Sequence, residues 1–188
     1  MFKICKPYHN ATIHQISQPF GVNPTSYQPN GHTGVDIYPA SFAYGTFLVA
    51  PEDVIIKEVI DQTTFAVKFL ENLSKGFGVL MTSKANPDVD YLYWHLLPNI
   101  PVKKGQLVSQ GEAVGQMGNS GFVMSGGVLV PIEHRSIKPY NGTHLHYEVR
   151  VKNQYVNPIP LIDFSIPVKR TTNQWIMQVL LKMSNLLK

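Results

Sequence analysis

Short runs of β-branched and aromatic residues constrain this chain more than any other feature. The runs cover residues 46–60, 64–70, 78–83, 89–97 and 145–151. Gly, Pro, Asn and Asp lie between them at short intervals, which is typical of strands joined by turns. The sequence therefore predicts a mainly β fold, in which an antiparallel sheet or a sandwich-like arrangement forms a single domain.

The composition fits one folded domain. Of the 188 residues, 44% are hydrophobic and 15% are charged, so the chain can fill a core and is not a disordered polymer. The net charge of +4 comes from scattered basic residues, with no recognition helix or aromatic and basic repeat, so we expect no nucleic-acid partner. Cys5 is the single cysteine, which excludes an internal disulfide, and no nucleophile motif surrounds it.

The end of the chain follows a different period. Apolar residues recur there at helical spacing: Ile176, Val179, Leu180, Met183 and Leu187. We expect an N-terminal segment over 1–15, a domain over 16–162, a linker over 163–170 and a short amphipathic C-terminal helix over 171–188. The helix could dock on its own domain, mediate self-association, bind virion proteins or lie on a membrane surface.

The stretch GHTGVDIY, residues 31–38, places His32 and Asp36 four residues apart. In a straight strand such residues share a face but lie about 13 Å apart, whereas metal donors lie about 2.0 to 2.2 Å from one Zn²⁺. The backbone would have to bend between them, and Gly34 is the residue that permits a bend. A turn that holds a satisfied histidine is the alternative interpretation.

Two histidines, His144 and His146, lie two residues apart in a run that has the pattern of a strand. Strand residues two apart project from the same face about 6.6 Å apart, so both imidazoles can reach one small volume. Leu145, Tyr147 and Val149 then pack into the core from the other face. The pair could supply two metal ligands, or one ligand and one histidine beside the metal, or two exposed histidines; the spacing leaves all three open.

His95 lies in LYWHLL, where a period of two puts Tyr93, His95 and Leu97 on one face. Alone, His95 could be a half-buried structural residue. Together with the two earlier motifs it suggests a catalytic zinc shell of two imidazoles and one carboxylate with an open fourth position. Two histidines would remain to move a proton or to stabilise an oxyanion. No glycine-rich phosphate motif follows a strand, so hydrolysis is the expected reaction.

The motifs together resemble the lysostaphin-type zinc endopeptidases of bacterial cell walls. The resemblance covers residues 16–162, in the family's order, and rests on these stretches: ISQPFG (16–21), GHTGVDIY (31–38), VAPEDVIIKEV (49–59), YWHLL (93–97), VKKGQLVSQGEAVGQMGNSG (102–121), GTHLHYEVR (142–150) and VNPIPLI (156–162). It implies a mostly antiparallel β fold with the site in a groove walled by loops.

The resemblance also assigns roles to residues. It implies that His32, Asp36 and His146 bind one Zn²⁺ per chain. It places His95 and His144 as the two catalytic histidines. The family cuts peptide bonds in peptidoglycan stem peptides or cross-bridges, so the implied function is that of a zinc metalloendopeptidase with peptidoglycan as its substrate.

One insertion departs from the family pattern. Residues 122–141 separate the glycine-rich turn GNSG from the paired histidines, where the family has only a few residues. We expect this insertion at the rim of the groove. Within it, His134, Arg135 and Lys138 could contact carboxylates of the substrate, or could simply belong to a solvated loop.

The sequence has no run of about 18 apolar residues, so we expect no transmembrane segment. The N-terminus MFKICKPYHN lacks the apolar core of a secretory signal, and no wall-binding repeat is recognisable. These features favour a phage lysin or a virion component, which acts at the bacterial cell wall and resides in the virion or the host cytoplasm before lysis.

Two other functions are compatible with parts of the sequence. Some relatives of this fold have lost ligands and serve as binding or activating modules, although all five site residues are present here. The stretch VKKGQLVSQGEAVG also resembles biotinyl and lipoyl carrier domains, but the modifiable lysine of their motif is missing. An active peptidase is the interpretation that uses the most residues.

Overall fold

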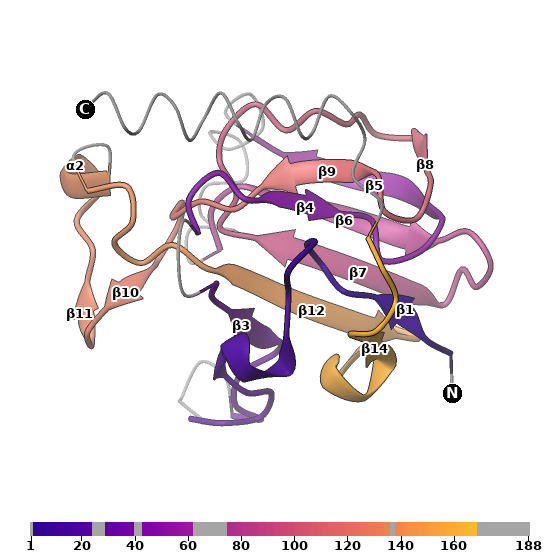
Figure 1. The fold of residues 1–188 in the computed structure, drawn as a ribbon, viewed down its shortest axis with the longest axis horizontal. Helices are drawn as coiled ribbons and strands as arrows, with labels where there is room; N and C mark the ends of the chain where they lie inside the picture. The colour runs from indigo at the N-terminus through magenta and orange to yellow at the C-terminus, as the bar shows by residue number, and fades with distance from the viewer. Residues whose placement is uncertain (1, 24–28, 40–42, 62–74, 136–137, 169–188) are drawn as a thin grey trace.

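An antiparallel sheet dominates the computed structural model, which describes residues 2–23, 29–39, 43–61, 75–135 and 138–168 (Figure 1). Its strands lie in the order β2 (Ile16–Gln18), β3 (Val35–Ile37), β12 (Leu145–Val151), β7 (Val89–Trp94), β6 (Gly78–Ser83), β5 (Val54–Ile60) and β8 (Leu107–Val108), and β13 (Gln154–Val156) also pairs with β12. All these pairings are antiparallel. The predicted mainly β, antiparallel fold is confirmed.

The central strands are buried on both faces. Strands β4 (Phe47–Val49) and β9 (Ala113–Gln116) form a two-stranded ribbon (Figure 1). This ribbon contributes Leu48 and Val114 to the main core, which also contains Tyr91 and Tyr93 of β7. The alternate residues of β7 belong to a smaller cluster of Ile60, Leu92 and Trp94. The aromatic run predicted as a strand therefore packs apolar side chains in both directions, because successive side chains of a strand point to opposite faces.

The N-terminal segment packs on the same body as the sheet. Strand β1 (Ile4–Cys5) pairs in parallel with β14 (Ile162–Asp163). One short 3-10 helix, Ile13–Gln15, directly precedes β2, and another, Ile159–Leu161, directly precedes β14. Tyr8 is also buried. Within the described ranges, no helix combines the length and the hydropathy needed to cross a bilayer.

Predicted and observed strands agree closely in the middle of the sheet. The runs 78–83 and 145–151 coincide with β6 and β12. The run 46–60 instead forms two strands, β4 and β5, because the chain turns at residues 51–53, where Pro51 has no N–H to donate to a ladder. The predicted strand 64–70 and the predicted C-terminal helix 171–188 lie outside the described residues.

The insertion forms a small structure of its own. Strands β10 (Met124–Ser125) and β11 (Val128–Leu129) make a hairpin that projects from one end of the sheet, followed by helix α2 (Ile132–Arg135) (Figure 1). At its base, the buried Asn119 side chain donates to the carbonyl oxygens of Pro139 and Asn141, each at 3.2 Å. The C-terminal end of the insertion is thus tied to the glycine-rich turn that precedes it.

Candidate active site

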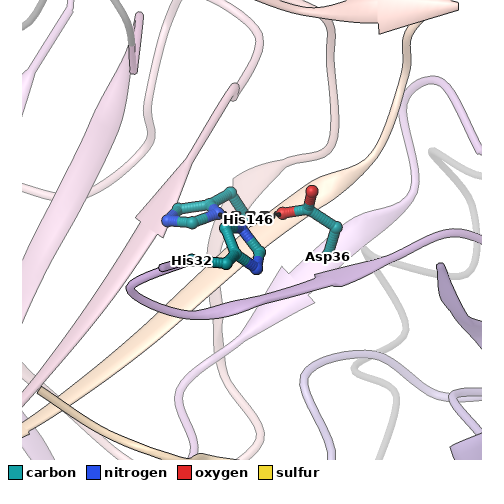
Figure 2. A group of neighbouring side chains, drawn as sticks. All are labelled: His32, Asp36 and His146. Carbon is teal, nitrogen blue, oxygen red and sulfur yellow. Dashed lines mark hydrogen bonds and ion pairs between the residues drawn. The ribbon is translucent and has the colours of Figure 1, made fainter. Parts of the chain in front are cut away.

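The register of the sheet brings Asp36 and His146 together. Asp36 of β3 lies directly opposite His146 of β12, and side chains in such cross-strand pairs are neighbours on one face. Nδ1 of His146 lies 2.8 Å from Oδ1 of Asp36 (Figure 2). Two residues that are far apart in the sequence are therefore fixed by backbone pairing rather than by a loop.

His32 reaches the same point from the segment before β3. The chain bends at Thr33 and Gly34, and Nε2 of His32 lies 2.9 Å from Nδ1 of His146 and 3.2 Å from Oδ1 of Asp36 (Figure 2). The predicted bend is confirmed, but the reason for a glycine differs. A Cβ at Gly34 would lie 2.3 Å from the carbonyl oxygen of Tyr147, so the close approach of β12 requires Gly34, which does not have a left-handed conformation.

His95 does not continue the strand that precedes it. Strand β7 ends at Trp94, and His95 has φ of 63°, a left-handed conformation that is uncommon outside glycine. The predicted shared face of Tyr93, His95 and Leu97 is therefore wrong. The backbone N–H of His95 donates to the carbonyl oxygen of Lys75 at 3.1 Å, and His95 is among the residues that line the site.

The paired histidines behave as the strand period predicts. His144 directly precedes β12, and Nε2 of His144 lies 3.7 Å from Oδ1 of Asp36. Its ring centroid is 4.6 Å from that of His95. On the other face Leu145, Tyr147 and Val149 are buried in the main core. The structure thus brings all five sequence-predicted site residues to one place.

Three of the four histidines are oriented in the same way. Nδ1 of His32, His95 and His144 each lies next to a backbone carbonyl oxygen. The respective carbonyls belong to Pro19 at 3.1 Å, Ser120 at 2.8 Å and Gly142 at 2.8 Å. A carbonyl oxygen only accepts hydrogen bonds, so Nδ1 carries the proton and Nε2 keeps a lone pair that faces the site. His146 is the exception, since its Nδ1 faces Asp36.

Burial and neighbouring charge set the protonation of the site. Burial alone would raise the pKa of Asp36, but the hydrogen bonds to His146 and His32 outweigh it and hold the pKa well below its usual range. Burial lowers the pKa of His95, and the neighbouring His144 and His146 lower it further. Burial also lowers the pKa of His144, although Asp36 opposes this. The site therefore combines an ionised carboxylate with two neutral imidazoles near pH 7.

The donor set of His32, Asp36 and His146 fits a zinc ion. One donor atom from each of these residues lies within 4.8 Å of the other two. Ligands at about 2.0 to 2.2 Å from a tetrahedral zinc stand about 3.3 to 3.6 Å from one another, close to the 2.8, 2.9 and 3.2 Å separations observed here. Two imidazoles and one carboxylate are also ligands that zinc prefers.

The site opens into a pocket of about 740 Å³. Its walls include Phe122, Met124 and Tyr140, so the prediction that the insertion lies at the rim is confirmed. The pocket lining does not include His134, Arg135 or Lys138. Arg135 instead donates to the carbonyl oxygen of Val130 at 3.1 Å. Lys75, by contrast, does line the pocket.

The sequence reasoning missed two charged residues beside the site, Glu148 and Lys75. Glu148 is buried, and its Oε1 lies 3.2 Å from Nε2 of His146 and 2.7 Å from Nζ of Lys75. Burial alone would raise the pKa of Glu148, but His146 and Lys75 outweigh it and keep the pKa low. The strand period could have revealed Glu148, because it follows His144 and His146 on the same face. No sequence signal marks Lys75.

Comparison with known proteins identifies the family to which this chain belongs. Residues 30–158 match the sequence profile of Peptidase family M23. An uncharacterized metalloprotease of Haemophilus influenzae is 28% identical over 148 residues, which cover 77% of this chain and 24% of that protein. The chain thus spans about a quarter of the length of this relative. The family resemblance drawn from the motifs is confirmed.

Two solved structures have a similar fold. A zinc-containing peptidase from Vibrio cholerae has a TM-score of 0.54 at 22% identity, covering 82% of this chain and 39% of that one. The catalytic domain of the antimicrobial peptidase lysostaphin from Staphylococcus simulans has a TM-score of 0.51 at 20% identity, covering 85% of this chain and 90% of that one. At these identities the likeness concerns the fold.

Proposed function

The chain belongs to peptidase family M23, and we propose that it is a zinc-dependent endopeptidase that hydrolyses peptide bonds of bacterial peptidoglycan. The observation that carries this proposal is the meeting of three metal donors and two further histidines in one open pocket. A silent binding module would need the pocket but would have no use for this particular set of side chains.

His32, Asp36 and His146 would hold one Zn²⁺ per chain. A bound zinc polarises a carbonyl group and lowers the pKa of water. The residues around it are already ordered for this task, because Asp36 and His146 are fixed by the β3–β12 register and His32 by the carbonyl of Pro19. Little reorganisation of these side chains is then needed on binding.

His95 and His144 would serve as the proton carriers. Each donates from Nδ1 to a backbone carbonyl, which leaves the lone pair of Nε2 as a base. One Nε2 takes the proton of the attacking water and later gives it to the leaving amine, and a protonated imidazole can stabilise the oxyanion. Their lowered pKa keeps both rings in the neutral form that can accept a proton at pH 7.

A wall peptide is the substrate that the pocket and the relatives favour. The pocket is open and mixed in character, with Ser17, Gln18 and Lys75 beside Phe122 and Tyr140, so it can receive an extended peptide. One protein of similar fold is an antimicrobial peptidase, which supports a bacterial target. Action at the bacterial cell wall as a phage lysin or a virion component stays a prediction from the sequence.

Digestion of purified peptidoglycans tests this proposal. Walls with different cross-bridges are incubated with the zinc-loaded protein, and the released fragments are identified by mass spectrometry. We expect new amino termini at one type of peptide bond, absent with the Asp36→Ala variant and after chelation. Intact walls in the presence of a fully zinc-loaded protein would overturn the assignment of peptidoglycan as substrate.

A further inference from the structure

His146 is oriented differently from the other three site histidines. Their Nδ1 atoms donate to backbone carbonyls, whereas Nδ1 of His146 faces Asp36 and His32. Its Nε2 is buried and makes no well-aligned hydrogen bond within the described part of the chain, and Oε1 of Glu148 lies 3.2 Å from it. The ring nitrogen of His146 that does not face Asp36 therefore lies beside a side-chain carboxylate. In the other three histidines the corresponding nitrogen lies beside a backbone carbonyl.

Glu148 is held rigidly in that place. The residue is 0% exposed. Its carboxylate accepts hydrogen bonds from Oγ1 of Thr33 at 2.5 Å and Nζ of Lys75 at 2.7 Å on Oε1, and from Nε1 of Trp94 at 2.8 Å on Oε2. Three donors from three different segments thus fix the carboxylate, which a buried charge needs in order to be tolerated.

Gly34 explains how Thr33 can reach this carboxylate. A Cβ at Gly34 would lie 2.9 Å from Cγ of Glu148, so the glycine lets the bend that carries His32 pass directly over the Glu148 side chain. Thr33 follows His32 in the chain, and its hydroxyl donates to Glu148. One carboxylate therefore links the segment that carries one predicted metal ligand to the strand that carries another.

Lys75 contacts both the Glu148 carboxylate and His95, one of the two proposed proton carriers. Its side chain is 23% exposed and its Nζ lies 5.4 Å from the Trp94 ring and 5.5 Å from the Tyr155 ring. The backbone carbonyl of Lys75 accepts from the N–H of His95 at 3.1 Å. The residue therefore contacts Glu148 through its side chain and His95 through its backbone.

We propose that Glu148, with Lys75 as its counter-ion, is the positioning residue that directs Nδ1 of His146 toward the metal. A carboxylate only accepts hydrogen bonds, so it selects the ring form that carries the proton on Nε2 and the lone pair on Nδ1. Partners of this kind orient metal-ligating histidines and increase their basicity. The proposal rests on the proposed function, in which His146 is a zinc ligand.

The sheet offers a matched control for this carboxylate. Asp90 of β7 is also buried and is held by Oγ1 of Thr82 at 2.7 Å, Nζ of Lys57 at 3.1 Å and a guanidinium nitrogen of Arg150 at 3.4 Å. Like Glu148, it is held by a threonine hydroxyl and a lysine. None of these three partners is one of the five site residues, so Asp90→Asn removes a comparable buried charge without reaching His146.

Zinc affinity of the full chain tests the positioning role. The dissociation constants of the wild type, Glu148→Gln and Asp90→Asn are measured by competition with a chromophoric chelator, and thermal unfolding of the zinc-free proteins reports the fold separately. We expect the zinc Kd of Glu148→Gln to rise about 10- to 100-fold while that of Asp90→Asn stays at the wild-type value. A folded Glu148→Gln protein with the wild-type zinc Kd would overturn the proposal.

Lys75→Met is a second test that disturbs the fold less. The Lys75 side chain is partly exposed, so we expect this variant to fold. We expect a weaker zinc affinity and a lower kcat, because the substitution removes the counter-ion that holds Glu148 beside His146. Unchanged zinc Kd and kcat in Lys75→Met would count against the pair even if Glu148→Gln did not fold. A wild type that binds no zinc would instead remove the proposed function itself.

Discussion

The five site residues and part of the insertion over 122–141 line the same pocket but are built differently. His146 is 6% exposed and sits on a central strand, whereas Phe122 and Val128 of the insertion are 54% and 69% exposed. The first region is fixed by ladder pairing on both sides of β12, and the second by a hairpin with two residues in each strand. An isolated hairpin is at best marginally stable.

The difference teaches where this fold can vary. A change in sheet register would move Asp36 away from His146, so the chemistry can tolerate little change in the sheet. The hairpin contributes Met124 and Ser125 to the pocket wall without holding any of the five site residues. We therefore expect variants of the first region to affect zinc and turnover, and variants of the second to affect the choice of substrate.

The largest effect should come from removing a zinc ligand. His32→Ala and Asp36→Ala each delete a donor that the remaining two cannot replace, so we expect loss of zinc and a fall in wall hydrolysis by a factor of about 1,000 or more. Metal content after gel filtration and fragment release are the measurements. Chelation of the wild type should give the same loss, and added Zn²⁺ should restore activity. Full activity of a metal-free preparation would contradict the zinc mechanism.

The next effect separates turnover from metal binding within the same region. His95→Ala and His144→Ala remove a proton carrier, so we expect kcat to fall about 100- to 10,000-fold while one zinc per chain remains. Metal analysis beside steady-state kinetics measures both. Zinc loss from His144→Ala together with zinc retention in His146→Ala would reverse the roles given to this pair.

The insertion should give a moderate effect of a different kind. Phe122→Ser and Met124→Ser remove apolar wall from the pocket, so we expect kcat/KM to shift between wall substrates by up to about tenfold, or about 1.4 kcal/mol, with zinc content unchanged. Val128→Ser is the control, since Val128 is on the same hairpin but does not line the pocket. Equal effects of all three variants would mean that the hairpin acts through stability rather than contact.

The smallest effect is a difference in thiol reactivity between the buried strand β1 and the exposed hairpin of the insertion. Burial raises the pKa of the Cys5 thiol from 9.0 to about 11, so at pH 8 the folded protein holds about a hundredfold less thiolate than the unfolded chain. We expect no labelling of Cys5 by a thiol reagent until denaturant is added. Ser125→Cys, on the exposed hairpin, should label rapidly under the same conditions. Fast labelling of native Cys5 would show that the N-terminal strand opens readily.

The sequence predicted the site well where local periodicity decides the geometry. The shared face of His144 and His146 follows from the strand period, and the same period could have identified Glu148. The opposition of Asp36 and His146 could not be predicted, because register depends on pairing between distant strands. The strand face shared by Tyr93, His95 and Leu97 was predicted wrongly, because β7 ends at Trp94 and His95 has a left-handed backbone. The hairpin in the insertion was also missed, because its four strand residues carry too little pattern.

X-ray absorption of the zinc-loaded chain is the most direct test of the claim that the sheet register builds the metal site. The account predicts a shell of nitrogen and oxygen donors at about 2.0 to 2.2 Å, with two imidazoles in the wild type and in His95→Ala, and loss of the zinc signal in His146→Ala. A sulfur donor at about 2.3 Å, or an imidazole count that changes in His95→Ala and not in His146→Ala, would contradict it.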